Sequence, residues 1–372
     1  WTNCLASKNK SLQVKTINKI AKSRAQSQSL VDVSKINLFA KHFRSLCENS
    51  LIKDRAGKFN FSPNSKAVDW MDSQKIKEYI AILPRNKAPG PSGITNETLQ
   101  IASNLIDEFF SLLFKACMIH SVVPSAWKIA SIVPVPKKGD LTKAENYRPI
   151  ALLETPRKLF ELVLQDVIKD QMTPLSIYQG GFRPNRSTLD QVANLKDLMK
   201  LHKARYGEFP FIAFLDIKAA YDSVDRAVLF KKCLLKGISP NIVELLRQMY
   251  DFNCAFVSIN GVNSQTFDLP AGVQQGSIIS PLLYSIFIDD IVAALKEGPG
   301  FKSPWIGIEN FNVLMYADDI AVVARTPEGL NSLLDICSEH SKSNNYKFSL
   351  KKCVYLSKHK PHVEIVMDGS PI

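Results

Sequence analysis

A mixed α+β fold is predicted for this chain of 372 residues. Segments with apolar residues at helical spacing alternate with short apolar runs that are typical of strands. Two pairs of those runs are separated by short polar turns, which indicates antiparallel hairpins. Apolar residues make up 45% of the sequence, enough for a substantial core and too many for a mainly disordered chain.

The first sixty residues are predicted to form a basic helical extension. Residues 1–58 carry twelve lysines and arginines against three acidic residues, a net charge of +9, whereas the whole chain carries +12. Phe39 and Phe43 offer only a small apolar face. The excess positive charge favours contact with a nucleic-acid backbone, although a solvated helical surface would account for it equally well.

Two helices and a loop are predicted next. Asp72 and Ser73 precede apolar residues at positions 76, 79, 80 and 83, so Asp72 can cap a helix that begins there. Residues 83–93 are rich in proline and glycine and are expected to form a structured loop. A longer helical pattern covers residues 95–118.

The middle of the chain is predicted to contain both helices and strands. Ser187 and Asp190 have the spacing of a capping box, which marks a helix start. The expected elements are strands at 129–135 and 149–153, a helix at 156–171, a helix from 187 toward 205 and a buried strand at 209–216.

The last third is predicted to contain two hairpins, a helix and a strand. Asp318 and Asp319 fall at the turn of the second hairpin, between two apolar runs. The expected elements are hairpins at 255–269 and 311–324, a helix at 327–343 and a strand at 348–356.

Several classes of protein are disfavoured. The most apolar stretch, 278–295, contains Pro281 and the pair Asp289 and Asp290, which argues against a membrane span. The seven cysteines include no CxxC pair and indicate reduced thiols rather than a zinc site or a disulfide framework. Because the chain starts at Trp1 and stops at Ile372, it is expected to be part of a longer polypeptide.

Three carboxylates are candidates for chemistry. Asp216 ends a fully apolar strand, where a carboxylate is costly unless it is paired or bound to a cation. If that strand lies beside the second hairpin, Asp216 and Asp318 come close, and their repulsion is relieved by a divalent ion such as Mg²⁺. Two such ions suit phosphoryl transfer. An ordinary hairpin turn, in which aspartate is common, is about as good an interpretation.

The sequence resembles reverse transcriptases at three motifs. Residues 214–225 read FLDIKAAYDSVD, residues 272–283 read GVQQGSIISPLL and residues 316–319 read YADD. Several short upstream motifs are similar to those of the non-LTR, LINE-type branch of these enzymes. They are KAPGP at 87–91, WK at 127–128, PKKGD at 136–140, NYRPI at 146–150 and GFRPNRST at 181–188. Each motif is weak alone, but the ordered set is highly specific.

The resemblance implies a right-hand polymerase fold, with an antiparallel palm sheet flanked by helices. It places the fingers and part of the palm at 61–208, the catalytic palm at 209–345, and the end of the palm with the start of the thumb connection at 346–372. The thumb is expected to be largely missing.

The resemblance also implies a metal site. Asp216 and Asp318, with the main-chain carbonyl of Ile217, would hold two Mg²⁺ ions, for which Mn²⁺ can substitute. Asp319 would lie beside them near the primer end, which makes Asp216, Asp318 and Asp319 the expected catalytic carboxylates.

A dNTP site is implied beside these carboxylates. The amides of Ala219 and Ala220 would meet the triphosphate, and Tyr221 would exclude a 2′-hydroxyl; without the flanking motif Tyr221 would be taken for a core tyrosine. Gln275 and Gly276 would lie under the new base pair, since glycine permits close backbone approach.

Several cations complete the implied site. Arg148, with Lys138 or its neighbour Lys137, would bind the phosphates, although a solvated turn would explain the two lysines as well. Lys352 matches a lysine proposed to protonate pyrophosphate, and as an alternative is a surface lysine. The implied template contacts are Arg183 and Arg186; Arg183 could equally brace the fingers.

The sequence departs from the family pattern at three positions. Gln274 stands where proline is usual, Ser92 replaces an aspartate and Ser349 replaces an asparagine. None of these positions is one of the three carboxylates, so the departures bear on rate or fidelity more than on the class of reaction.

The expected function is therefore RNA-directed DNA synthesis by a non-LTR retrotransposon protein. The implied partners are an RNA template, a DNA primer or target DNA, and dNTPs, without a membrane, and the implied location is intracellular, in the nucleus at the site of target-primed synthesis. Two alternatives are an RNA-dependent RNA polymerase, which Tyr221 disfavours, and a decayed or domesticated copy that only binds RNA.

Overall fold

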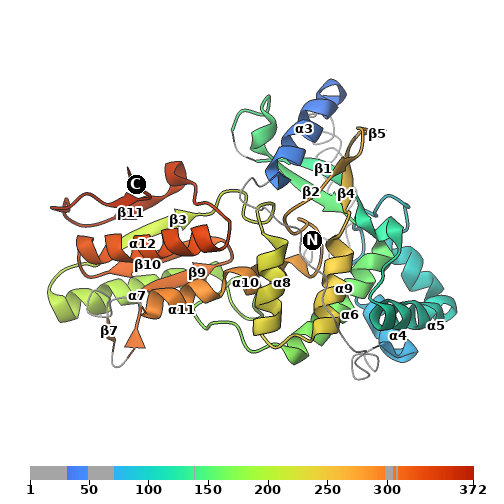
Figure 1. Cartoon of the computed structure of the whole chain (residues 1–372), viewed down its shortest axis with the longest axis horizontal. Coiled ribbons are helices and arrows are strands. Elements are labelled where there is room, and N and C mark those ends of the chain that lie inside the picture. The colour runs from blue at the N-terminus through green and yellow to red at the C-terminus, as the bar shows by residue number, and fades with distance from the viewer. Residues whose placement is uncertain (1–31, 49–70, 138, 298–304, 307–308) are drawn as a thin grey trace, which may run out of the picture.

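The computed structural model describes residues 32–48, 71–137, 139–297, 305–306 and 309–372. They form an elongated molecule in which two β-sheets lie toward opposite ends, with helices between and around them (Figure 1). The mixture of helices and sheets confirms the predicted α+β class.

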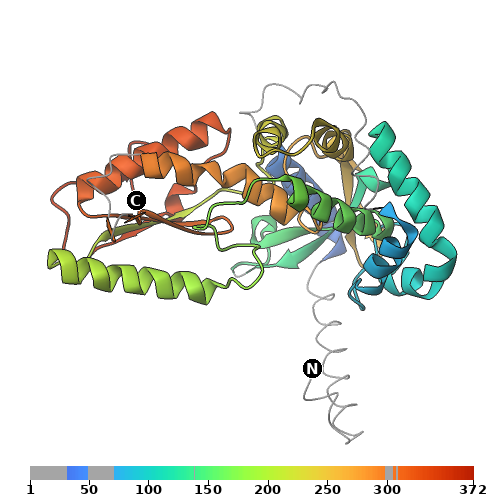
Figure 2. The same ribbon diagram turned by 90° about the horizontal axis from the view of Figure 1, so that it is seen from below.

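The first sheet has four antiparallel strands in the order β11-β3-β10-β9. Its helices are α12 (Pro327–Ser343) and α11 (Asp290–Glu297) on one face and α7 (Thr188–Tyr206) on the other (Figure 2). The strands are β3 (Phe211–Asp216), β9 (Val313–Tyr316), β10 (Asp319–Ala324) and β11 (Val354–Leu356).

The second sheet joins segments that are more than a hundred residues apart. Its order is β2-β1-β4-β5, with β6 also paired to β4, and β1 runs parallel to β4. The predicted division at residues 208 and 209 therefore cuts across this sheet, and the assignment of fingers and palm stays a prediction. The strands are β1 (Ile129–Pro136), β2 (Tyr147–Leu152), β4 (Cys254–Ile259), β5 (Val262–Asn263) and β6 (Phe267–Asp268).

Helix α3 (Ile36–Cys47) lies in the region predicted as a basic extension, and its helical state confirms that part of the prediction. Phe39 and Phe43 are buried in the core against the second sheet, so α3 is packed rather than solvated. The remainder of the predicted extension lies outside the described residues.

A largely helical core joins the two sheets. Helix α10 (Ser280–Ile288) is apolar almost all round and lies inside this core. The other helices are α4 (Ser73–Ala81), α5 (Asn96–His120), α6 (Thr155–Gln171), α8 (Arg226–Leu235) and α9 (Pro240–Tyr250). Two short hairpins complete the described part of the chain, β7 (Trp305–Ile306) with β8 (Glu309–Asn310) and β12 (Val366–Met367) with β13 (Ser370–Pro371).

Local capping determines several of these boundaries, as the sequence predicts. The Asp72 carboxylate accepts from the amide of Gln74, and Ser187 and Asp190 form the reciprocal capping box at the start of α7. The strand predicted at 348–356 is wrong in part, because residues 350–352 form a 3₁₀ turn before β11. None of the described helices is long and apolar enough to cross a membrane.

Candidate active site

Strand register brings the three predicted carboxylates to one edge of the four-stranded sheet. Asp216 ends β3 and lies opposite Asp319, the first residue of β10. Asp318 lies in the tight turn between β9 and β10, after Ala317, whose φ of +58° is left-handed. We call Asp216, Asp318 and Asp319 the carboxylate edge.

The electrostatics confirm that these carboxylates influence one another. Burial and the nearby Asp216 raise the pKa of Asp318, and burial, Asp318 and Asp216 raise that of Asp319. Like charges held this close favour a bound cation or a proton. Oxygen donors suit Mg²⁺, so the residues fit the implied metal. Within the described residues, no group of three carboxylate, imidazole or thiol side chains forms a metal cluster by itself.

Lys352 contacts the carboxylate edge directly. Its Nζ lies 3.0 Å from Asp216 Oδ2, and its side chain is 67% exposed. The 3₁₀ turn that contains Lys352 is tied to the same strand, because the amide of Ser349 at its start donates to the Asp216 carbonyl at 2.7 Å. The structure therefore brings together Lys352 and Asp216, which are 136 positions apart.

An open cleft of about 510 Å³ lies between α7 and this sheet. Asp216, Asp319 and Lys352 line it together with apolar residues of α7 such as Val192 and Leu195. The carboxylate edge is thus reachable from solvent.

The segment after β3 is held against the chain that leads to Lys352. The amide of Lys218 donates to the carbonyl of Lys347, and Ile217 pairs with Phe348 in an isolated bridge. Ala219 is left-handed, with φ of +48°, while Ala220 is buried. This turn places the main chain of Ile217, Ala219 and Ala220 directly after Asp216.

Tyr221 packs among aromatic rings. Its ring stacks on that of Tyr284 with centroids 5.1 Å apart, and Phe182 approaches edge-on at 6.3 Å. Burial and the nearby Asp318 raise the pKa of Tyr221. The residue is half-buried and close to the carboxylate edge, which is compatible with both the sugar-gate and the core interpretation.

The loop with Gln275 and Gly276 rests on β2 of the second sheet. The amide of Ala151 donates to the Gln275 carbonyl at 2.7 Å. Gly276 has φ of +135°, and a Cβ there would lie 2.2 Å from the Ala151 carbonyl oxygen, so no other residue fits without a shift. The Gln275 side chain donates to Asp222 at 2.8 Å. Burial raises the pKa of Asp222 to about 7.

The predicted phosphate-binding cations lie at the edge of the second sheet. Arg148 is exposed on β2, opposite Val135 of β1. Burial, Arg148 and Lys352 lower the pKa of Lys137, whereas Asp222 and Asp216 act in the opposite direction. Lys137 is therefore near the carboxylates, and Lys138 lies outside the described residues.

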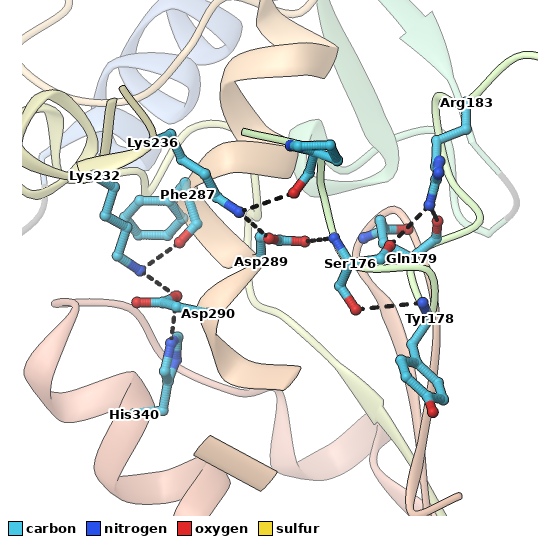
Figure 3. Close-up of polar contacts among 11 residues, drawn as sticks. Ser176, Tyr178, Gln179, Arg183, Lys232, Lys236, Phe287, Asp289, Asp290 and His340 are labelled. Atoms are coloured by element: carbon cyan, nitrogen blue, oxygen red, sulfur yellow. Dashed lines mark hydrogen bonds and ion pairs between the residues drawn. The ribbon is translucent and has the colours of Figure 1, made fainter. Parts of the chain in front are cut away.

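The two predicted template-binding arginines differ in their surroundings. Arg183 donates from Nη1 to the carbonyls of Ser176, at 2.9 Å, and Gln179, at 3.4 Å, so it braces its own loop (Figure 3). The loop lies against the four-stranded sheet, where Gln179 pairs with Met315. Template contact and bracing of the fingers both stay predictions for Arg183. Arg186 is exposed.

Two of the departures from the family pattern have partners. Arg157 donates to the Gln274 side chain at 2.6 Å and forms a fully buried ion pair with Glu161 at 2.9 Å. Ser92 donates to Glu154 from its amide, at 2.9 Å, and from its hydroxyl. Both positions thus gain a buried or half-buried polar contact that a proline or an aspartate could not make in the same way.

Sequence reasoning missed Asp222 and Arg157 as parts of this site. Asp222 lies inside a motif segment, FLDIKAAYDSVD, so its position next to Tyr221 was a usable signal. Arg157 carries no such signal, because its partner Gln274 is 117 positions away.

The comparisons with known proteins decide the family. A model described as "Reverse transcriptase (RNA-dependent DNA polymerase)" matches residues 135–364, more than half of the chain. The chain belongs to the reverse transcriptase family. The match includes every residue of the carboxylate edge together with Lys352.

The relatives of this reverse transcriptase chain come from mobile elements. It is 30% identical over 292 residues to the "RNA-directed DNA polymerase from mobile element jockey" of Drosophila melanogaster, covering 75% of this chain and 31% of the relative. It is 31% identical over 256 residues to the "Probable RNA-directed DNA polymerase from transposon BS" of the same species, covering 67% and 27%.

A third relative is more distant. The "Retrovirus-related Pol polyprotein from type-2 retrotransposable element R2DM" of Drosophila melanogaster is 25% identical over 270 residues, covering 72% of this chain and 25% of the relative. The chain spans less than a third of the length of these three curated relatives. The predicted resemblance to reverse transcriptases of non-LTR retrotransposons is confirmed.

Proposed function

We propose that this chain is the RNA-directed DNA polymerase region of a non-LTR retrotransposon protein, which extends a DNA primer on an RNA template. The observation that carries the proposal is the carboxylate edge, where strand register sets Asp216 opposite Asp319 with Asp318 in the adjoining turn. Membership of the reverse transcriptase family supports the same activity.

Asp216 and Asp318, with the Ile217 carbonyl, would hold two Mg²⁺ ions, or Mn²⁺ in their place. When bound, the ions supply positive charge beside the reacting phosphate. The raised pKa of Asp318 and Asp319 supports this assignment, because a cation relieves the same repulsion.

In the proposed reaction the primer 3′-hydroxyl attacks the α-phosphate of a dNTP and pyrophosphate leaves. Most of the work of the protein is to hold the reactants in line and to balance their charge. Arg148 and Lys137 would bind the triphosphate, with Lys138 as a further candidate, and Lys352 would give a proton to pyrophosphate.

The remaining predicted residues would position and select the incoming nucleotide and the template. The amides of Ala219 and Ala220 would contact the triphosphate, and Tyr221 would exclude a ribonucleotide by contact with its 2′-hydroxyl. Gln275 and Gly276 would support the new base pair. Arg186, and Arg183 through the loop that it braces, would act on the template.

The broader assignments belong to the same proposal. The four-stranded sheet and its helices would form the palm, and the second sheet would lie between palm and fingers. The partners would be an RNA template, a DNA primer or target DNA, and dNTPs, and the protein would act in the nucleus at the site of target-primed synthesis.

Primer extension on an RNA template tests the proposal. Parallel reactions receive dNTPs or rNTPs, each with Mg²⁺, Mn²⁺ or a chelator. We expect DNA products that require dNTPs and a divalent ion. Products made only from rNTPs would identify an RNA polymerase, and tight RNA binding without extension under any condition would identify a binding protein.

A further inference from the structure

A short segment far from the three motifs lies against the turn that carries Asp318. The amide of Met315 in β9 donates to the Tyr178 carbonyl at 3.0 Å, and the amide of Gly180 donates to the Met315 carbonyl at 2.8 Å. Gln179 thereby pairs with Met315 as a short parallel bridge. Residues 178–181 add to the outer edge of the four-stranded sheet, just before its metal-binding turn begins.

The Gln179 side chain is fully buried and forms hydrogen bonds with the backbone of that turn. Its Oε1 accepts from the amide of Ala317 at 2.9 Å, and its Nε2 donates to the carbonyl of Ala317 at 3.1 Å. Oε1 also accepts from the amide of Gly181 at 2.8 Å. One side-chain amide therefore satisfies both backbone polar groups of the residue next to Asp318.

The residue that Gln179 contacts has an unfavourable conformation. Ala317 is left-handed, with φ of +58°, a region that is unfavourable for a residue with a Cβ. The backbone of Gly181 packs directly against Ala317, because a Cβ at position 181 would lie 2.1 Å from the Ala317 nitrogen. A strained turn of this kind persists when its surroundings over-determine it.

We propose that Gln179 is a positioning residue, which holds Ala317 in its left-handed conformation and so aims the Asp318 carboxylate. The inference deepens the proposed function, on which its activity readout rests. Glutamine suits the role because its side-chain amide carries N–H donors and an acceptor oxygen at the same reach, matching the carbonyl and the amide of Ala317.

The loop that carries Gln179, residues 176–183, is held in place by contacts that do not involve the carboxylate edge (Figure 3). The amide of Ser176 donates to Asp289 at 2.8 Å, and Asp289 is paired with Lys236 at 2.5 Å. Arg183 donates to the carbonyls of Ser176 and Gln179 in the same loop. The loop is thus fixed to α8 and the end of α10, so Gln179 can act as a rigid support.

The test compares Gln179→Met, which keeps the length of the side chain but removes its hydrogen bonds, with Gln100→Met as a matched control. Gln100 also bonds to main-chain carbonyls, those of residues 80, 81 and 83, but it lies on α5 away from the carboxylate edge. Each variant is measured for kcat and KM in primer extension and for Mn²⁺ affinity by electron paramagnetic resonance.

We expect Q179M to lose about tenfold to hundredfold in kcat, with the KM for dNTP changed less than threefold, as for a misplaced catalytic group. Mn²⁺ affinity should fall severalfold, and Q100M should match the wild type in both. Adding Ala317→Gly to Q179M should restore part of the loss, because glycine adopts a left-handed φ without strain. A merely structural role would not give that rescue.

Wild-type kcat and Mn²⁺ affinity in Q179M would overturn the proposal. If Q179M does not fold, Gln179→Glu replaces it: this variant keeps the acceptor but lacks the donor for the Ala317 carbonyl, and wild-type values in it would likewise refute the role. If the wild type makes no DNA, the proposed function fails, while the Mn²⁺ comparison still decides whether Gln179 aims Asp318.

Discussion

The carboxylate edge and the junction between α10 and α11 both gather aspartates, yet their charges are balanced differently. At the junction, Asp289 pairs with Lys236 at 2.5 Å, while Asp290 contacts both Lys232, at 2.6 Å, and His340, at 2.9 Å (Figure 3). The lysines and His340 come from helices α8 and α12, so the junction links separate parts of the core.

The carboxylate edge has three acidic groups with far less compensation. Lys352 pairs with Asp216, whereas among the described residues neither Asp318 nor Asp319 forms an ion pair. Burial and the nearby Asp216 raise the pKa of Asp318. Burial acts in the same direction on Asp290, but hydrogen bonds and charge from His340 and Lys232 lower its pKa. Matched charge supports the fold, and unmatched charge marks a place for a ligand.

The largest expected effect is a loss of activity at the carboxylate edge. Asp318→Asn should reduce primer extension by roughly a thousandfold or more, because the proposed metal loses a charged ligand. The melting temperature should stay the same or rise slightly, since one repelling charge is removed. Extension assays and thermal melts measure the two effects, and retained synthesis would contradict the metal assignment.

The next largest effect is a loss of stability at the junction between α10 and α11. Asp289→Ala should lower the free energy of unfolding by about 3 kcal/mol, because it leaves Lys236 without its partner and the Ser176 amide without an acceptor. Urea denaturation measures the change. Asp335→Ala, at an exposed position of α12, is the control and should change stability by less than about 0.5 kcal/mol. Equal losses of unfolding free energy in Asp289→Ala and Asp335→Ala would show that the ion pair of Asp289 does not stabilise the fold.

A smaller effect is expected at the lysine that touches the carboxylate edge. Lys352→Met should lower kcat about tenfold to hundredfold through loss of the proposed proton donor. Stability should be nearly unchanged, because the side chain of Lys352 in the pair with Asp216 is 67% exposed. Single-turnover extension as a function of pH checks this. A variant that keeps the wild-type rate but melts several degrees lower would make Lys352 a structural residue.

The smallest effect concerns the pH dependence of folding. The folded-state pKa of Asp222 is raised to about 7 from its ordinary 3.8, so the folded state binds the proton more tightly than the unfolded state does. Stability from this group is therefore lost as pH rises from 4 to 7.

Relative to Asp222→Asn, the wild type should lose about 1–2 kcal/mol of unfolding free energy across that window, less than the full linkage value because Asp222 is partly exposed. Urea melts of both proteins at several pH values measure the difference. Parallel curves for the two proteins would show that Asp222 titrates normally.

The sequence predicts the carboxylate edge well because its information is local. Asp216 ends an apolar run and Asp318 interrupts another, so once the strands pair, register alone brings them together. The caps at Asp72 and Ser187 are local in the same way. By contrast, α10 is apolar almost all round, so it offers no amphipathic period from which a helix could be predicted.

The supports of the site are not local and therefore escape prediction. Gln179 reaches Ala317 across 138 positions, and Arg157 reaches Gln274 across 117. Neither contact leaves a periodic trace, because a single buried polar side chain looks like any surface glutamine or arginine in the sequence. Only the fold reveals that these groups are enclosed and which backbone they satisfy.

The central claim is that the carboxylate edge binds two divalent ions. The most direct test is to count the Mn²⁺ ions that the protein binds in the presence of an RNA template, a DNA primer that lacks its 3′-hydroxyl, and a dNTP. We predict saturable binding of two ions to the wild type and to Asp290→Asn, and loss of that binding in Asp216→Asn and Asp318→Asn. Two ions bound with undiminished affinity in Asp318→Asn would contradict the account.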